Sequence, residues 1–135
     1  MRLEKNRHAV YKLQFRLIIV TKGGHPIIDK EISLRLKEIA KHIFEDSWKC
    51  KILEVETEED HIHIAFESSP QTQLSKLVNN FKTVSSRLIR KEFKNHLRKY
   101  YWKDFFWSPS YCLLSVGGAP IEIIREYIRS QKKPQ

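Results

Sequence analysis

The sequence predicts one α+β domain, a ferredoxin-like or RRM-like β-α-β-β-α-β sandwich with an antiparallel sheet and one further helix after it. Three observations predict this class: a long strand-like segment comes first, two amphipathic helical periodicities follow, and a short acidic turn separates two strand-like segments between them. The length of 135 residues fits a single domain over residues 1–135. We expect its core over about residues 8–116 and its last helix over about 120–131.

The first half of the pattern contains three strands and one helix. Residues 9–21 alternate between polar and apolar and then run apolar, which predicts a long strand. A turn with two glycines follows at 22–26, and apolar residues recur at helical spacing over 32–46. Alternation returns over 50–56 and 61–67, and the acidic turn between these segments predicts a hairpin.

The second half begins with the longer helix. Apolar residues at helical spacing predict it from residue 74 to 89, with an extension towards 96. An aromatic segment over 100–111 leads into a short strand over 111–116. Gly117 and Gly118 then break the chain before the last helix, whose first residue is a proline.

Charge and cysteine content restrict the class of protein. The chain has 25 Lys and Arg against 16 Asp and Glu, a net charge of +9, which favours nucleic acid as the partner. The hydrophobic content of 41% excludes a disordered polar chain, a collagen-like repeat and a disulfide scaffold. Cys50 and Cys112 are expected to be reduced thiols of a cytoplasmic protein. No apolar run reaches the roughly 18 residues of a membrane span, and no signal peptide is predicted.

Two histidines stand two positions apart in the second hairpin strand. On a strand, His61 and His63 project from one face about 7 Å apart, with Ile62 on the other face. Two neutral imidazoles there form two corners of a divalent-metal site. Taken by themselves, they are better explained as surface histidines on a half-buried strand, because two ligands do not make a metal site.

One tyrosine and one glutamine share a face of the last helix. Tyr127 and Gln131 are one turn apart and lie in the same arc as Ile124 and Ile128. Core packing explains a tyrosine in this arc. A buried glutamine needs a hydrogen-bond partner or a ligand, so Gln131 is the more informative of the two.

Two sets of residues are candidates for DNA contact. Aromatic rings interleaved with cations in the 98–111 segment suit stacking on single-stranded bases, although some of these rings are expected to cover the sheet. The polar stripe of the long helix suits a phosphate backbone, and it equally fits an ordinary solvated face. The candidates are Lys76, Arg87, Arg90, Tyr101, Trp102 and Trp107.

In this order, the motifs resemble the single-tyrosine HUH transposases of small bacterial and archaeal insertion sequences, including their REP-associated relatives. The resemblance covers nearly the whole chain. It is carried by Val20-Thr21-Lys22, His61-Ile62-His63, the helix from Leu74 to Ser86, Phe106-Trp107-Ser108-Pro109-Ser110-Tyr111, Val116-Gly117-Gly118 and the helix from Ile124 to Gln131.

The resemblance implies a homodimeric transposase that uses Mg²⁺ or Mn²⁺ and no nucleotide cofactor. By position, His61 and His63 match the metal-binding pair, Gln131 the third protein ligand and Tyr127 the nucleophile. The implied reaction cleaves and rejoins single-stranded DNA with hairpin ends, at insertion-sequence ends, through a 5′-phosphotyrosine intermediate. We expect the Gly117-Gly118 pair to act as a hinge for the tyrosine helix.

Three other functions remain open at this point. A non-catalytic RRM-like nucleic-acid binder explains the charge, the fold and the aromatic residues, but it leaves the histidines and Gln131 unexplained. A replication-initiation nuclease or relaxase usually carries further domains or a second tyrosine in the active-site helix. A domesticated HUH nuclease acting on chromosomal repeats would share every residue named above.

Overall fold

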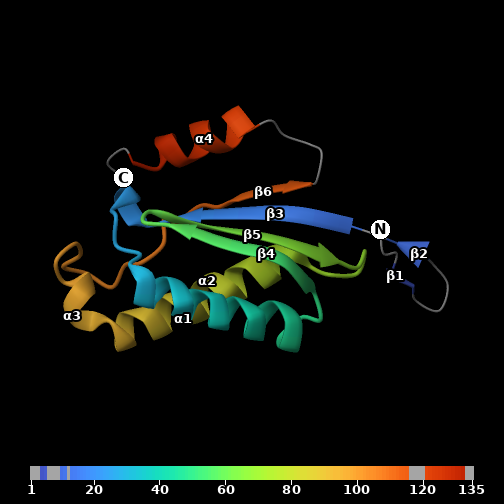
Figure 1. Ribbon diagram of the computed structural model, residues 1–135, viewed down its shortest axis with the longest axis horizontal. Helices are drawn as coiled ribbons and strands as arrows, with labels where there is room; N and C mark the ends of the chain where they lie inside the picture. The colour runs from blue at the N-terminus through green and yellow to red at the C-terminus, as the bar shows by residue number, and fades with distance from the viewer. Residues whose placement is uncertain (1–3, 6–9, 12, 116–120, 133–135) are drawn as a thin grey trace.

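Four strands form one antiparallel sheet in the order β4-β5-β3-β6 (Figure 1). They are β3 (Leu13–Val20), β4 (Lys51–Glu58), β5 (His61–Ser68) and β6 (Cys112–Ser115). The computed structural model describes residues 4–5, 10–11, 13–115 and 121–132. Hairpin partners β4 and β5 lie side by side, and the first and last strands of the pattern are neighbours, as the ferredoxin-like prediction requires.

Two helices cover one face of the sheet and one covers the other (Figure 1). Helices α1 (Lys30–Lys41) and α2 (Leu74–Glu92) lie below the sheet in this view, with the short α3 (Lys94–Leu97) after them. Helix α4 (Ile121–Ser130) lies alone on the opposite face. The predicted α+β sandwich with one further helix is therefore confirmed.

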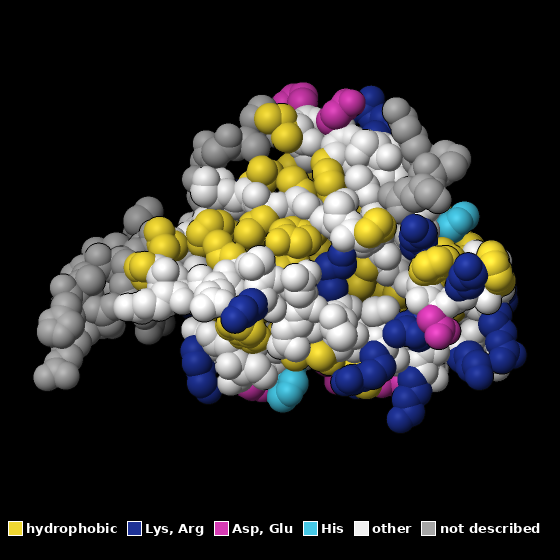
Figure 2. All heavy atoms as spheres, turned by 180° about the vertical axis from the view of Figure 1, so that it is seen from behind, with side chains coloured by type: hydrophobic (Ala, Val, Ile, Leu, Met, Phe, Trp, Pro, Cys, Tyr) yellow, Lys and Arg dark blue, Asp and Glu magenta, His cyan; other side chains and the backbone are white. Residues whose placement is uncertain are grey.

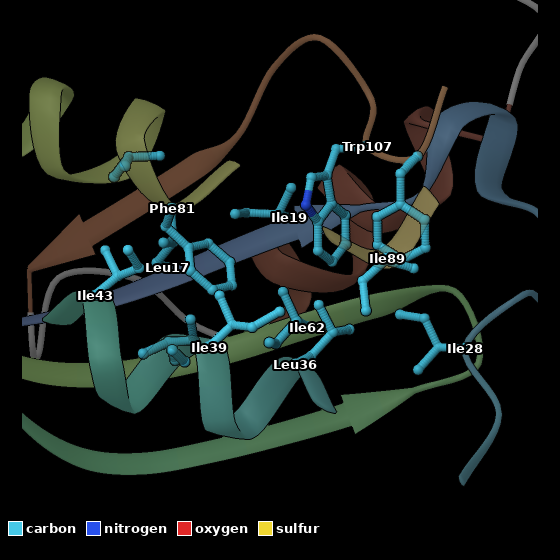
Figure 3. Packing of buried hydrophobic residues seen from close by; sticks show 14 of the residues in the cluster. Leu17, Ile19, Ile28, Leu36, Ile39, Ile43, Ile62, Phe81, Ile89 and Trp107 are labelled. Atoms are coloured by element: carbon cyan, nitrogen blue, oxygen red, sulfur yellow. The ribbon is translucent and has the colours of Figure 1, made fainter. Parts of the chain in front are cut away.

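The core lies between the sheet and the α1–α2 layer (Figure 3). Alternate residues of β3 and β5, among them Leu17, Ile19 and Ile62, point into it and meet Phe81 of α2. The intervening residues of these strands point towards α4, because side chains alternate along a strand. Of these, Ile18 is also buried, so the sheet is covered at this residue on the α4 side as well.

The first strand and the hairpin differ in extent from the prediction. The segment 9–21 divides, because β3 pairs with β5 only as far as Leu13 opposite Ser68; β2 (Val10–Tyr11) instead pairs with β1 (Glu4–Lys5) in a separate two-stranded sheet. The hairpin turn is shorter than 56–60, because β4 continues to Glu58 opposite His61. A bulge between Ile52 and Glu54 explains the two adjacent apolar residues in β4.

The ends of helices α1 and α2 also differ from the prediction. Helix α1 ends at Lys41, and a π-helical segment, His42–Ser47, follows it directly. Helix α2 ends before Phe93, whose backbone leaves the helical region, so the predicted extension towards residue 96 is a separate turn, α3. The expected Gly117-Gly118 hinge and the proline at 120 lie outside the described residues. In the described part of the chain, no helix is both long and apolar enough to cross a membrane.

Candidate functional site

The two histidines lie on the face of β5 that looks towards α4. His61 pairs with Val20 of β3 and His63 pairs with Ile18, while Ile62 between them is completely buried in the core. Both imidazoles are partly exposed. The structure thus places them on one face of one strand, as the spacing predicts.

His63 is held as a neutral ring. Burial lowers the pKa of its imidazole, and the nearby Arg16 guanidinium lowers it further. Its Nε2 atom is buried and has no hydrogen-bond partner among the described residues. A buried nitrogen without a partner costs free energy unless a ligand or water contacts it, so this atom is suited to bind an electron-pair acceptor.

His61 is oriented by the residue before it. The Asp60 carboxylate lies 2.7 Å from Nδ1 of His61 and 3.2 Å from the Lys132 ammonium at the end of α4. Burial acts to raise the pKa of Asp60, but the contacts with His61 and Lys132 outweigh it and lower the pKa overall. A charged Asp60 therefore fixes the His61 ring and ties the end of α4 to the start of β5.

Tyr127 and Gln131 lie on the face of α4 that packs against the chain. Ile124 and Ile128 share that face and are half-buried, which confirms the predicted arc. The Tyr127 hydroxyl is 2.9 Å from the Ser110 hydroxyl. Burial raises the pKa of Tyr127, and the hydrogen bond with Ser110 acts in the opposite sense.

The Gln131 amide is held by two serines. Its Oε1 atom accepts hydrogen bonds from the Ser108 hydroxyl and, at 3.3 Å, from the Ser110 hydroxyl. The backbone N–H of Ser108 donates to the carbonyl of Val20, the residue opposite His61. Gln131 and the histidines therefore lie at the same end of the sheet, on the α4 side.

The donor set has an amide where many metal sites have a carboxylate. Within the described residues, no three His, Cys, Asp or Glu side chains come together as a metal-binding group. The candidate set instead consists of His61, His63 and Gln131, which supply two imidazole nitrogens and one carbonyl oxygen. These atom types fit a divalent cation.

Four DNA-contact candidates lie at the surface, and a basic region surrounds two of them. Lys76 and Arg87 are exposed on α2, and Trp102 is 86% exposed with the Lys103 ammonium 4.6 Å from its ring centre. Arg90 lies 3.7 Å from Asp104. Lys and Arg side chains gather at the end of the molecule that carries α3 (Figure 2), and a pocket there is lined by Arg90, Lys94, Arg98, Trp102 and Lys103.

Two further candidates, Tyr101 and Trp107, are core residues instead. Each is 7% exposed. The Tyr101 hydroxyl donates to the Lys22 carbonyl at 2.6 Å, and the Trp107 indole donates to the Ser85 hydroxyl at 2.9 Å. Because their rings are covered and their polar atoms are bonded inside the protein, they are not the exposed stacking platforms that the sequence predicts.

Sequence reasoning missed the residues that hold the site together. Asp60, Ser108 and Ser110 make the contacts described above, and Lys82 of α2 binds the same serine segment. Asp60 directly precedes His61, which is the one signal that could have marked it. The serines lie in an irregular segment, where no periodicity indicates which way a side chain points.

Comparison with known families identifies the class of protein. A model of IS200-like transposases matches residues 9–131, nearly the whole chain. The chain belongs to the IS200-like transposase family. Transposases act by cleaving DNA and transferring its ends, so this family places the chain among DNA-processing enzymes.

Individual relatives of the IS200-like transposase agree with this assignment. The ISDra2 transposase TnpA of Deinococcus radiodurans is 29% identical over 131 residues, 97% of this chain and 92% of that protein. The transposase of the IS200 element of Salmonella typhimurium is 33% identical over 125 residues, 92% of this chain and 80% of that protein. A crystal structure of a protein assigned as a transposase, from Deinococcus radiodurans R1, superposes with a TM-score of 0.85 at 30% identity, covering 95% and 97% of the two chains.

A more distant structure shares the fold of this IS200-like transposase. It is the REP-associated tyrosine transposase bound to a REP hairpin, with a TM-score of 0.54 at 10% identity. The match covers 93% of this chain and 67% of that one. At this identity the likeness concerns the fold alone.

Proposed function

We propose that this transposase cleaves and rejoins single-stranded DNA at insertion-sequence ends, with Tyr127 as the nucleophile. The observation that supports this proposal is the position of α4. This helix holds Tyr127 and Gln131 against the end of the sheet where β5 begins, which is also where the two histidines lie. A phenol on a helix that is fixed at several points can be aimed at a phosphorus atom, as in-line attack requires.

The donor atoms fit a divalent cation, which the family resemblance implies as Mg²⁺ or Mn²⁺. His61, His63 and Gln131 would hold it, and the partnerless Nε2 of His63 is the observation that supports a ligand here. The low pKa of His63 keeps that ring neutral, as a metal ligand must be. A bound cation supplies charge compensation for the oxygens of the scissile phosphate.

The chain's own residues then perform the transfer. The Tyr127 oxygen forms a bond to phosphorus, the bond from phosphorus to the 3′ oxygen breaks, and that oxygen leaves as a 3′-hydroxyl after taking up a proton. Because burial raises the pKa of Tyr127, the phenol is protonated at neutral pH and must lose its proton during attack. The product is a 5′-phosphotyrosine, which a second DNA 3′-hydroxyl can attack in reverse without ATP.

We further propose that the substrate carries a hairpin and that the active species is a homodimer. Exposed cations of α2 suit a phosphate backbone, and the open Trp102 ring suits a splayed base. The distant fold relative was solved bound to a REP hairpin. Each chain offers one Tyr127, so moving an element with two ends needs two chains.

The decisive experiment is the detection of a covalent adduct between the protein and DNA. Wild-type protein is incubated with hairpin-bearing single-stranded DNA and Mn²⁺, and the mixture is separated on a denaturing gel. We expect an adduct on Tyr127 by mass spectrometry, none with Tyr127→Phe, and a normal amount with the matched control Tyr100→Phe. Retained hairpin binding by Tyr127→Phe shows that the protein is intact; an adduct on another residue contradicts the proposal.

A further inference from the structure

Lys82 of α2 binds three consecutive backbone carbonyls. Its ammonium donates to the carbonyl oxygens of Ser108 at 2.8 Å, Pro109 at 3.1 Å and Ser110 at 3.2 Å. A lysine ammonium has three N–H donors and no acceptor, so these three bonds use its full capacity. Lys82 therefore has no donor left over for a DNA phosphate while this arrangement holds.

The same three residues carry the contacts to α4. The side chain of Ser110 meets the Tyr127 phenol, and the side chains of Ser108 and Ser110 both donate to the Gln131 amide. The segment 108–110 thus lies between Lys82 and the two proposed active-site residues of α4. Its backbone faces the lysine, and its hydroxyls face the tyrosine helix.

Regular pairing does not fix this segment along its whole length. Its first residue is bonded to β3 through the Ser108 N–H and the Val20 carbonyl, and the preceding Trp107 pairs with Thr21, directly after β3. Pairing with β3 resumes only at Cys112. The carbonyls of Pro109 and Ser110 belong to the unpaired residues between these two points, and the Lys82 side chain binds both of them.

The Lys82 side chain is half-buried, which costs free energy for a charged group unless hydrogen bonds replace its lost hydration. Burial lowers the pKa of Lys82. Three carbonyl dipoles offset the lost hydration, because each hydrogen bond to a charged group is stronger than a neutral one. A lysine that only kept the helix soluble would extend into water, as the exposed Lys91 of the same helix does.

We propose that Lys82 is a positioning residue, which holds Tyr127 and Gln131 at the histidine end of the sheet by fixing the 108–110 segment. The inference rests on the proposed function for what Tyr127 and Gln131 do there, but the docking of α4 can be measured without any reaction. Lys82 touches no reacting atom, so its effect must pass through the serine contacts.

The first test is hydrogen exchange of free protein, followed by mass spectrometry. In Lys82→Met we expect the amides of Ile121–Ser130 to exchange about tenfold faster, because weaker docking raises the population of locally opened α4. The matched control Lys91→Met leaves α4 exchange unchanged. Lys82→Arg keeps the charge but replaces the three-donor ammonium by a planar fork, so it also loosens α4 and serves where Lys82→Met does not fold. Unchanged α4 exchange in both Lys82 variants overturns the proposal.

The second test is a double-mutant cycle in the single-turnover rate of adduct formation. Lys82→Met and Ser110→Ala are each expected to slow the rate by about 10- to 100-fold, and the double variant should be no slower than the slower single one. Hairpin affinity stays within about twofold, because positioning and not binding is lost. Multiplicative effects, or a large loss of affinity in Lys82→Met but not Lys82→Arg, contradict positioning. If wild type gives no Tyr127 adduct, the proposed function fails, and the exchange measurement still decides the role of Lys82.

Discussion

His63 shows how one residue can be prepared for a ligand by its surroundings alone. Its ring is partly buried, its pKa is lowered by that burial, and its Nε2 has no partner among the described residues. His61 is prepared differently, because the Asp60 carboxylate fixes its other nitrogen. The surroundings of His63 favour a neutral ring with a nitrogen open to a ligand, and the Asp60 contact fixes the orientation of the His61 ring.

Removal of either imidazole is therefore expected to weaken metal binding. In His61→Ala and His63→Ala, calorimetry should give a Mn²⁺ affinity lower than in wild type by at least about 10- to 100-fold, the range for loss of a residue that only supports a ligand. The proposed hairpin binding is expected to be retained in both variants, because it would depend on contacts with phosphates and bases and not on the imidazoles. The exposed His42→Ala is the matched control. Wild-type Mn²⁺ affinity in both variants would rule out this ligand assignment.

The aromatic segment shows what a sequence can and cannot predict at this scale. Tyr101, Trp102 and Trp107 look alike in the sequence, but Trp102 is open and the other two are buried. Strands and helices have a period that assigns each side chain to a face. The 100–111 segment is largely irregular and has no such period. The direction of its rings and serines is decided by tertiary contacts.

At the scale of elements, the end of α4 packs closely against a glycine turn. Gly24 has a φ of +70°, and a Cβ atom there would lie 2.5 Å from Cγ of Lys132 and 3.0 Å from its Cα. Gly23 has the same φ, but its added Cβ would meet only the His25 ring, at 3.3 Å. The two glycines thus share a backbone requirement and differ in what they touch.

Alanine substitutions at Gly23 and Gly24 should distinguish an effect on the stability of the fold from an effect on the docking of α4. Gly23→Ala and Gly24→Ala are each expected to lower the free energy of unfolding by about 1 to 2 kcal/mol, the cost of a left-handed backbone with a side chain. Urea denaturation measures this loss. Gly24→Ala alone should also displace α4 and raise its hydrogen exchange. Equal α4 exchange in the two variants would show that the Gly24 contact does not hold the helix.

The two helices of the core layer are joined by an ion pair that responds to pH. Arg35 of α1 donates to both carboxylate oxygens of Glu92 of α2, at 2.8 and 3.0 Å. The hydrogen bond from Arg35 lowers the pKa of Glu92 below its usual value of about 4.3. Folding therefore favours the charged form, so this stability is present above that usual pKa and is lost as the pH falls through the folded pKa.

Glu92→Gln is accordingly expected to be destabilising near neutral pH and silent in acid. The loss at pH 7 should be about 0.5 kcal/mol, because both groups are partly exposed and solvent screens the pair. Thermal unfolding of wild type and variant between pH 7 and pH 3 measures the difference, which should shrink towards zero. Glu59→Gln in the β4–β5 turn is the control. A difference that grows in acid would contradict the assigned sign.

Most elements could be predicted from the sequence, and their ends could not. Apolar periods identified β3, the β4–β5 hairpin, α1, α2 and α4, because one face of each is buried or, in β4 and α4, half-buried. The bulge at Leu53 leaves one signal in the sequence, two adjacent apolar residues that interrupt the alternation, whereas no local pattern marks the break at Phe93. Lys82 has the same limitation, since the carbonyls it binds are 26 to 28 residues away.

At the scale of the whole molecule, one proposed nucleophile per chain predicts an assembly of two. Sedimentation equilibrium at micromolar concentration is expected to give about twice the chain mass of 16.2 kDa. Tyr127→Phe should sediment as wild type does, because it removes one oxygen and keeps the ring. A mass of one chain in the presence of hairpin DNA would contradict the dimer.

Strand β5 uses one stretch of chain for two purposes. Ile62, Ile64 and Phe66 face the core, and the histidines alternate with them on the other side. Inserting one residue between His61 and Ile62 would exchange the two faces for the rest of this strand. The isoleucines would then face the α4 side and the His63 imidazole would face the core, so the protein would lose its stability together with its proposed chemistry. The two histidines are thus in phase with the hydrophobic core, and selection for folding alone penalises any change of length that would put them out of phase.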